Sequence, residues 1–214
     1  MKRVLILLLF ILVFVNGVSA YDLFFGCSDP SLNTNGKQCV EVTACRNLNQ
    51  AQTYYLVMNN ISTTGACFYA NQENITLNMN SHTLFFTQAS TVIRTFSDSW
   101  NFGNNFEIMN GEIVQTSASG QGNGGTGLIT FQGCDGCKVH DMRLITLSFM
   151  YPNIAINFPA TGTIEIYNND IQRNDQTISN GHTNVAAIHT AALDGVEHII
   201  LHHNNISGRP WLFD

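Results

Sequence analysis

The chain has 214 residues, a formal net charge of −6 and only 11% charged side chains. This length predicts one domain, and the acidic balance argues against nucleic acid or an anionic membrane as a partner. An acidic polysaccharide would also be repelled unless a metal ion or a local basic patch intervened. Polarity comes mainly from asparagine and hydroxyl side chains, which suit a long β surface with polar turns.

The N-terminus has the pattern of a secretory signal peptide. Lys2 and Arg3 precede an unbroken apolar run over residues 4–15, and Val18-Ser19-Ala20 offers a small-residue cleavage site. We therefore predict a signal peptide over residues 1–20, too short to span a bilayer, and no membrane span after it. The mature chain would carry seven basic and fifteen acidic residues, a charge of −8. The expected location is secreted, extracellular or at the cell surface.

Residues 21–50 form a cysteine-rich segment with Gly, Pro and Asn turn signals and little apolar periodicity. They predict a disulfide-pinned N-terminal cap over the exposed strand edges at the end of a repeat structure. Six cysteines fit an oxidising compartment. All fifteen connectivities stay open from sequence among Cys27, Cys39, Cys45, Cys67, Cys134 and Cys137.

From residue 51 onward, one six-residue pattern recurs: apolar, any, small or polar, any, any, apolar. Its five copies start 29, 31, 27 and 35 residues apart, at Met79, Ile108, Val139, Ile166 and Leu201. Strand-sized units at such intervals are typical of solenoids. The third position predicts a turn, because small polar side chains bond nearby backbone and tolerate left-handed conformations; it holds Ser81, Asn110, Asp141, Asn168 and His203.

A second short apolar stretch precedes each later copy, within residues 128–131, 154–158 and 187–190. Short turns link it to the six-residue pattern, and longer polar stretches separate the repeats. Three short strands per coil predict an all-β, parallel β-helix over residues 51–214, whose C-terminal end is either complete or cut short.

The motifs Tyr-Tyr-Leu, Asn-Asn-Ile-Ser, Gly-Ala-Cys and Asn-Ile-Thr-Leu, followed by Asn-Ser-His-Thr-Leu, lie within residues 54–84. Together with Ile-Met-Asn-Gly-Glu-Ile and Ile-Tyr-Asn-Asn-Asp-Ile, this series resembles right-handed parallel β-helix proteins of the pectin-lyase-like superfamily. The resemblance covers about residues 53–208. It implies the fold, and the rule for parallel β connections gives the same hand. It implies no single activity, because that superfamily includes lyases, hydrolases, adhesins and phage spikes.

Charge order supplies an independent check on the register. Stacked equivalent positions lie about 4.8 Å apart, so like charges should be kept apart along a column. Two columns alternate acid, base, acid: Glu107, Lys138 and Glu165, and Glu112, Arg143 and Asp170.

The resemblance implies that substrate lies along the outer face of the upstream strand, walled by long loops. If Phe131, Phe158 and Ile188 point inward, strand alternation turns their neighbours outward. The predicted ligand-binding residues are therefore Thr130, Asn157 and His189, and the loop over residues 172–184 adds Arg173, Asp175 and His182.

This cleft lacks a complete catalytic set. A hydrolase of the superfamily needs paired carboxylates, and a calcium-dependent lyase needs acidic ligands with a basic residue. The weak catalytic candidates are Arg173, Asp175, His182 and His189. We expect no cofactor, with calcium only if the protein is a lyase.

The histidines near residue 200 and the paired cysteines also have purely structural interpretations. His198 and His202 lie on one strand face but about 13 Å apart, too far to share an ion, so no metal site is predicted. For Cys134 and Cys137, a local disulfide or a buried thiol is predicted in preference to a redox, haem or zinc role.

The sequons at Asn60, Asn74 and Asn205 predict glycosylation in a eukaryotic host. We therefore expect a protein that binds or processes extracellular polysaccharide, as a polysaccharide lyase or glycoside hydrolase if it is active. The alternative is a non-catalytic structural or adhesive surface glycoprotein that associates with itself end to end through its C-terminal coil.

Overall fold

The computed structural model describes residues 23–87, 91–95, 105–117, 127–147, 153–157, 162–173, 187–191 and 198–208, without the side chains of Asn157 and Ala191. All regular structure in these ranges is β-strand. No helix there is long and apolar enough to cross a membrane. The predicted signal peptide lies outside the described residues.

The larger sheet has 11 strands in two bands. One band runs, in spatial order, through β1 (Gln38–Val42), β3 (Thr53–Val57), β6 (Thr76–Asn78), β9 (Glu107–Gln115), β11 (Cys137–Thr146), β13 (Thr163–Tyr167) and β16 (His198–His202). The other band uses the later halves of β9 and β11 together with β4 (Ile61–Thr63), β7 (Thr83–Phe86), β14 (Asp170–Arg173) and β17 (Asn205–Ser207).

The smaller sheet has six strands. They are β2 (Arg46–Leu48), β5 (Phe68–Ala70), β8 (Ile93–Thr95), β10 (Ile129–Gln132), β12 (Ile154–Asn157) and β15 (Ile188–Ala191). All strand pairs in both sheets are parallel, as β1 with β3 and β10 with β12 show. The predicted all-β fold with parallel strands is therefore confirmed.

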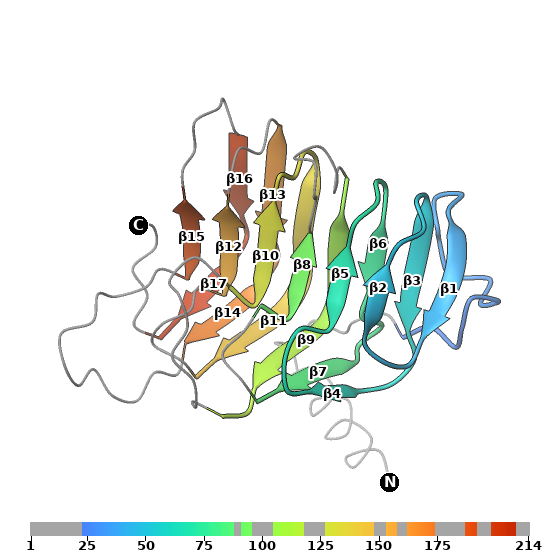
Figure 1. The fold of residues 1–214 in the computed structure, drawn as a ribbon, viewed down its shortest axis with the longest axis horizontal. Helices are drawn as coiled ribbons and strands as arrows, with labels where there is room; N and C mark the ends of the chain where they lie inside the picture. Colours follow the sequence, from blue (N-terminus) through green and yellow to red (C-terminus); the bar gives the residue numbers. More distant parts are fainter. Residues whose placement is uncertain are drawn as a thin grey trace, which may run out of the picture.

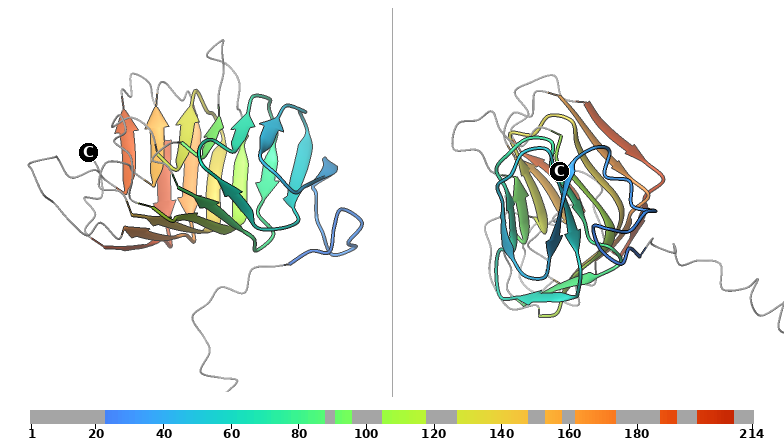
Figure 2. Two further views of the ribbon diagram at one scale, coloured as in Figure 1. Left: turned by 60° about the horizontal axis from the view of Figure 1, so that its bottom comes forward. Right: turned by 90° about the vertical axis from the view of Figure 1, so that its right-hand side faces the viewer.

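The chain visits the two sheets in turn. Each repeat after the first adds to both bands of the larger sheet, either with two strands or with the two halves of β9 or β11. Figure 1 shows the strands side by side in chain order, from β1 in blue to β15 and β16 in red. Figure 2, at right, views the molecule from the β1 end, where the strands of successive repeats overlie one another. The arrangement is compatible with a parallel β-helix.

The core lies between the sheets and consists of stacked apolar columns. One column in register holds Tyr55, Leu77, Ile108, Val139 and Ile166, and all five are buried. Because each such side chain leaves water, its burial contributes about 1.5–3 kcal/mol. The six-residue pattern thus stacks its first residues in register from Ile108 to Leu201. Its first copy is out of register by two residues, because Leu77 and not the predicted Met79 pairs with Ile108.

The turn column predicted from the third position is confirmed. Each of its members has a positive φ, from 52° to 69°: Ser81, Asn110, Asp141, Asn168 and His203. At this turn the chain leaves one band of the larger sheet and enters the other, inside β9 and β11.

A second left-handed column was not predicted. It precedes β3, β6, β9 and β11, with φ from 55° to 69° at Gln52, Asn74, Asn105 and Gly136. The Asn105 amide donates to the Asn74 side chain at 3.0 Å, which links two successive turns. The recurrent Asn or Gly at intervals of about one repeat was the available signal.

Both predicted charge columns are in register. Lys138 pairs with Glu107 and Glu165 along the strands, and its Nζ lies 3.2 Å from Glu165 Oε2. Arg143 lies 3.4 Å from Glu112 and 3.6 Å from Asp170. These ion pairs are half-exposed and contribute about 0.2–1 kcal/mol each. They are therefore evidence for the strand register and only a small source of stability.

The structure pairs Cys27 with Cys39, Cys45 with Cys67 and Cys134 with Cys137. The last pair is the local disulfide of the two options predicted. Three disulfides are typical of an extracellular, oxidising environment.

Residues 21–50 contain two strands of the sheets, β1 and β2. The segment before β1 is bound to the outer side of the larger sheet, where Cys27 N donates to Glu41 at 2.9 Å and Lys37 Nζ to Thr76 at 2.7 Å. The Asn80 amide donates to Phe24 O at 2.9 Å. Whether this segment also covers the strand edges at the end of the repeat stays a prediction.

Candidate functional site

The predicted cleft lies on the outer face of the smaller sheet, and Thr130 is not available there. Its side chain is 1% exposed. The hydroxyl oxygen accepts from Gly127 N at 3.0 Å and lies 3.1 Å from Thr91 Oγ1. A ligand would have to displace both partners to reach it.

The predicted column Thr130, Asn157 and His189 is wrong in register. In the register row of Thr130, the next two strands contribute Ala155 and then His189. Asn157 lies in a different row, with Gln132 and Ala191. The sequence alignment matched Phe131 with Phe158, but the structure pairs Phe131 with Ile156. A shift of two residues leaves every side chain on the same face of the sheet. The alternation of apolar and polar residues alone could therefore not reveal the error. His189 itself is half-buried on β15.

Arg173 was predicted on a loop beside this cleft, and that placement is wrong. It is the last residue of β14 and is 3% exposed, in register with Thr146 on β11. Asp175 and His182 lie outside the described residues. The described part of the chain therefore does not assemble the six predicted residues into one cleft.

The same face carries a contact that sequence reasoning missed. Arg94 Nε on β8 donates to Gln132 Oε1 on β10 at 3.0 Å, next to the exposed ring of Tyr69 on β5. These residues offer hydrogen-bonding and stacking groups, but no carboxylate for acid or base chemistry.

A more ordered polar cluster lies on the outer face of the larger sheet. The rings of His140, Tyr167 and His202 stack nearly parallel, with centroids 4.6 Å and 4.9 Å apart. They occupy one position of β11, β13 and β16, and the regular strand spacing brings the rings into contact. We call these three residues the aromatic stack.

Carboxylates flank the aromatic stack. His140 Nε2 lies 3.3 Å from Glu107 and its Nδ1 lies 2.7 Å from Asp141. His202 Nε2 lies 3.2 Å from Glu165. Each histidine thus reaches diagonally to a glutamate on the preceding strand. Sequence reasoning assigned the glutamates and histidines to separate columns and missed this cross-column contact.

These contacts perturb the protonation of the cluster. Burial lowers the pKa of His140, but its hydrogen bonds to Glu107 and Asp141 outweigh burial and raise the pKa overall. The hydrogen bond from His140 lowers the pKa of Glu107 against the opposing effect of burial. Burial, followed by the nearby carboxylates, raises the pKa of Tyr167 to about 12. The carboxylates thus favour the protonated form of the His140 ring, and both of its ring nitrogens already have carboxylate partners.

The pH dependence of stability follows from these shifts. A raised His140 pKa stabilises the fold below its unfolded value of about 6.5, and this is lost as pH rises through the folded value. A lowered Glu107 pKa stabilises above about 4.3 and is lost as pH falls. We expect the urea midpoint to peak near pH 5–6.

The variant His140→Gln should flatten the loss of stability between about pH 6 and pH 9 by about 1–2 kcal/mol, the range for a hydrogen bond to a charged group. Urea titrations at several pH values measure this. His198→Gln is the control, because His198 is exposed on β16. An unchanged slope in His140→Gln would contradict the assignment.

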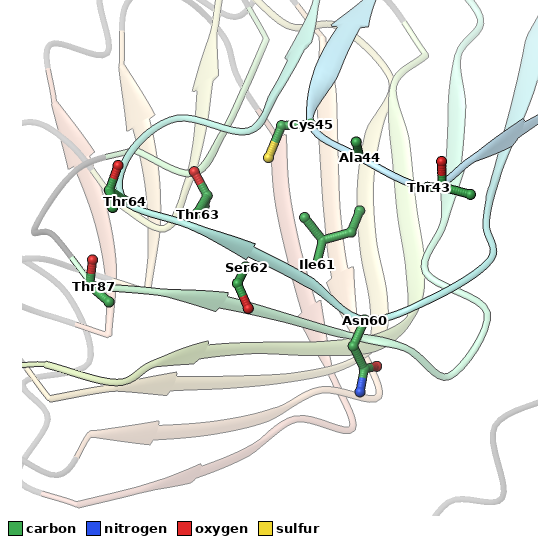
Figure 3. Close-up of a pocket in the computed structure, with 9 residues that line it drawn as sticks. All are labelled: Thr43, Ala44, Cys45, Asn60, Ile61, Ser62, Thr63, Thr64 and Thr87. Carbon is green, nitrogen blue, oxygen red and sulfur yellow. The ribbon is translucent and has the colours of Figure 1, made fainter.

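A groove of about 670 Å³ opens beside β4, near the β1 end of the molecule. Figure 3 shows its lining, which is rich in hydroxyl groups and includes an amide. The lining residues are Thr43, Ala44, Cys45, Asn60, Ile61, Ser62, Thr63, Thr64 and Thr87. None carries a charge, so the groove offers hydrogen bonds without general acid or base groups.

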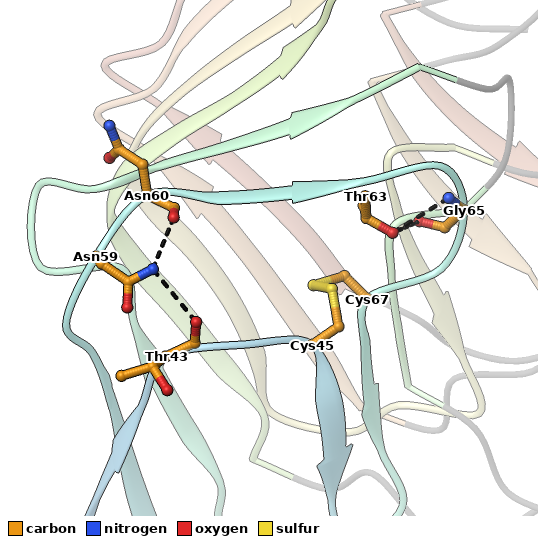
Figure 4. The surroundings of a disulfide bond; sticks show 7 residues. All are labelled: Thr43, Cys45, Asn59, Asn60, Thr63, Gly65 and Cys67. Carbon is orange, nitrogen blue, oxygen red and sulfur yellow. Dashed lines mark hydrogen bonds between the residues drawn. A yellow bond between two sulfur atoms is a disulfide. The ribbon is translucent and has the colours of Figure 1, made fainter.

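The groove exists because the first repeat goes directly from β1 to β2, through residues 43–45. In the second repeat β4 occupies this place, and in the described part of the chain β4 pairs with β7 alone. Figure 4 shows the disulfide between Cys45 and Cys67 that fastens the short link beside β4. The Asn59 amide donates to Thr43 O at 3.2 Å and to Asn60 O at 2.7 Å, which holds the other end.

The predicted glycosylation sites differ in access. Asn60 and Asn205 are exposed, on or next to the strands β4 and β17. Asn74 is half-buried, and its side-chain oxygen accepts from Asn105. Occupancy of all three stays a prediction.

Comparison with known proteins adds no relative. No protein-family model matches the chain, and neither a curated protein nor a solved structure does.

Proposed function

We propose that the protein is a secreted, right-handed parallel β-helix of the pectin-lyase-like type that binds extracellular polysaccharide without cleaving it. The fold assignment is supported by parallel strands, stacked apolar columns and two columns of left-handed turns. Secretion is supported by the N-terminal sequence pattern and three disulfides.

The observation that carries binding is the groove beside β4. Its volume of about 670 Å³ is within the usual range for small-ligand sites. Hydroxyl and amide side chains donate and accept hydrogen bonds, as sugar hydroxyls require. Since the described lining residues hold no charge, a neutral glycan segment is the fitting ligand class.

The absence of cleavage is proposed from the placement of carboxylates. Glu107 and Glu165, on the larger sheet, are bonded to histidines. Among the residues that the structure describes, no carboxylate lines the groove. Glycoside hydrolysis needs two such groups on either side of the bond.

The test is a binding screen of the folded chain against neutral polysaccharides, with reducing ends and unsaturated products measured in parallel. Ser62→Ala should raise the Kd about 2–10-fold, the loss of one hydrogen bond. Ser207→Ala is the matched control, because Ser207 is also exposed, lies in the same register row and also ends a sequon.

Binding with no new chain ends, weakened by Ser62→Ala alone, is the expected result. New chain ends would overturn the non-catalytic assignment. No binding by a folded sample would remove the glycan function altogether.

The second candidate is a structural or adhesive glycoprotein that stacks end to end. It is favoured by the outermost strands, such as β16 and β17, which pair on one side only within the described residues. Arg46 argues against end-to-end stacking. It is exposed on the edge strand β2, in register with the inward-facing Phe68, and its guanidinium lies over the Tyr55 ring. An inward-pointing charge on an edge strand opposes the addition of another chain. Electron microscopy at high concentration distinguishes filaments from single particles.

A further inference from the structure

His202, the last ring of the aromatic stack, forms a close pair with His203. His202 Nδ1 and His203 Nδ1 lie 2.9 Å apart, with the rings at 84° to each other. His203 has a φ of 55°, which turns the chain at the end of β16. Both rings reach solvent, His203 more than His202. Two ring nitrogens thus converge at one point on the surface.

The protonation of His202 follows from its other nitrogen. Nε2 lies 3.2 Å from the Glu165 carboxylate, which can only accept a hydrogen bond when ionised. The proton is therefore on Nε2, and the Nδ1 lone pair points toward His203. Tyr167, 4.9 Å away in a parallel stack, keeps the ring in this orientation. A carboxylate behind an imidazole is the usual support for a metal-binding histidine.

The equivalent pair two strands earlier has a different chemistry. There His140 faces Glu107 with one nitrogen and Asp141 with the other. Because both partners are carboxylates, His140 carries a second proton and has no free lone pair. His203 takes the place of Asp141 at the later turn, which leaves the Nδ1 of His202 without an anionic partner.

We propose that His202 and His203 bind a divalent transition-metal ion, Cu²⁺ by preference, through their Nδ1 atoms. Metal–nitrogen bonds are about 2.0–2.1 Å long, so a separation of 2.9 Å gives an angle of about 90° at the ion. That is the angle between adjacent ligands in a tetragonal Cu²⁺ site, and Cu²⁺ is the strongest binder of its row.

The remaining coordination positions belong to water. The described residues contain no cluster of three His, Cys, Asp or Glu side chains that could enclose an ion. Binding moves the His203 proton from Nδ1 to the solvent-facing Nε2, which is a small rearrangement for an exposed ring. The pair differs from His198 and His202, which sequence spacing rules out as partners on one ion.

The proposal is independent of glycan binding, because the groove lies near β1 and this pair lies at the end of β16. The test is a titration of the metal-free, untagged chain with Cu²⁺, followed by calorimetry and by electron paramagnetic resonance. We expect one site, with hyperfine splitting from two nitrogens. His203→Ala should weaken binding at least tenfold, and Glu165→Gln should weaken it about 10-fold to 100-fold.

His198→Ala is the matched control, since His198 is exposed on the same strand, and its Kd should equal that of the unaltered chain. Circular dichroism confirms that each variant is folded. Equal binding by His203→Ala, an equal loss in His198→Ala, or full affinity in Glu165→Gln would each overturn the proposal.

Discussion

Replacing Gly111 with alanine is expected to destabilise the fold by about 2–4 kcal/mol. A Cβ at this position would lie 2.3 Å from Met79 Cβ and 2.8 Å from the carbonyl oxygen of His82. That carbonyl accepts the hydrogen bond from Glu112 N at 3.1 Å, so the turns cannot separate without loss. Overpacking costs about 1–3 kcal/mol, and the weakened hydrogen bond adds about 1 kcal/mol.

Urea denaturation measures this change, and Gly65→Ala is the matched control. Nothing lies within 4 Å of a Cβ at Gly65, and its φ is not in the left-handed range. That variant should change the free energy of unfolding by no more than about 1 kcal/mol. Equal midpoints for the two variants would show that successive repeats are not in close contact at Gly111.

Removing the disulfide between Cys45 and Cys67 by a double alanine substitution should cost about 3 kcal/mol. The bond joins residues 22 apart, and restricting a loop of that length in the unfolded chain stabilises the fold by about that amount. The link over residues 43–45 forms one side of the groove. Its release should therefore also weaken any glycan binding, by roughly tenfold or about 1.4 kcal/mol.

The matched control removes the bond between Cys27 and Cys39, which joins residues 12 apart. Its expected cost is similar, about 3 kcal/mol, but it lies away from the groove lining. Chemical denaturation and glycan titration of both variants separate the two effects. If both variants lose glycan affinity equally, the loss reflects general instability and not the groove.

Local signals in the sequence predicted the turns well. Asn110, Asp141 and Asn168 all adopt the left-handed conformation expected of small polar residues at that place. The acid and base order of Glu112, Arg143 and Asp170 also predicted the register correctly. The turn signal recurs in five successive repeats and the charge order in three, and this repetition supports the alignment of those repeats.

The candidate sites were predicted poorly, for identifiable reasons. Phe158 looked equivalent to Phe131, and a two-residue error moved Asn157 out of its predicted row without changing its face. Arg173 looked like a loop residue because polar residues follow it, yet it ends β14 and is buried. Both wrong placements were compatible with the alternation of apolar and polar residues, which was the only constraint applied to these two residues.

The repeating pattern by itself determined the all-β class of fold with parallel strands, because the same apolar and turn positions recur at the interval of one repeat. Tertiary structure alone decided the pairing of Cys45 with Cys67, the groove beside β4 and the contact of His140 with Glu107. The His202 and His203 nitrogens likewise converge only through a stacked ring and a left-handed turn. Such features depend on diagonal distances between repeats, which the order of residues along one strand does not encode.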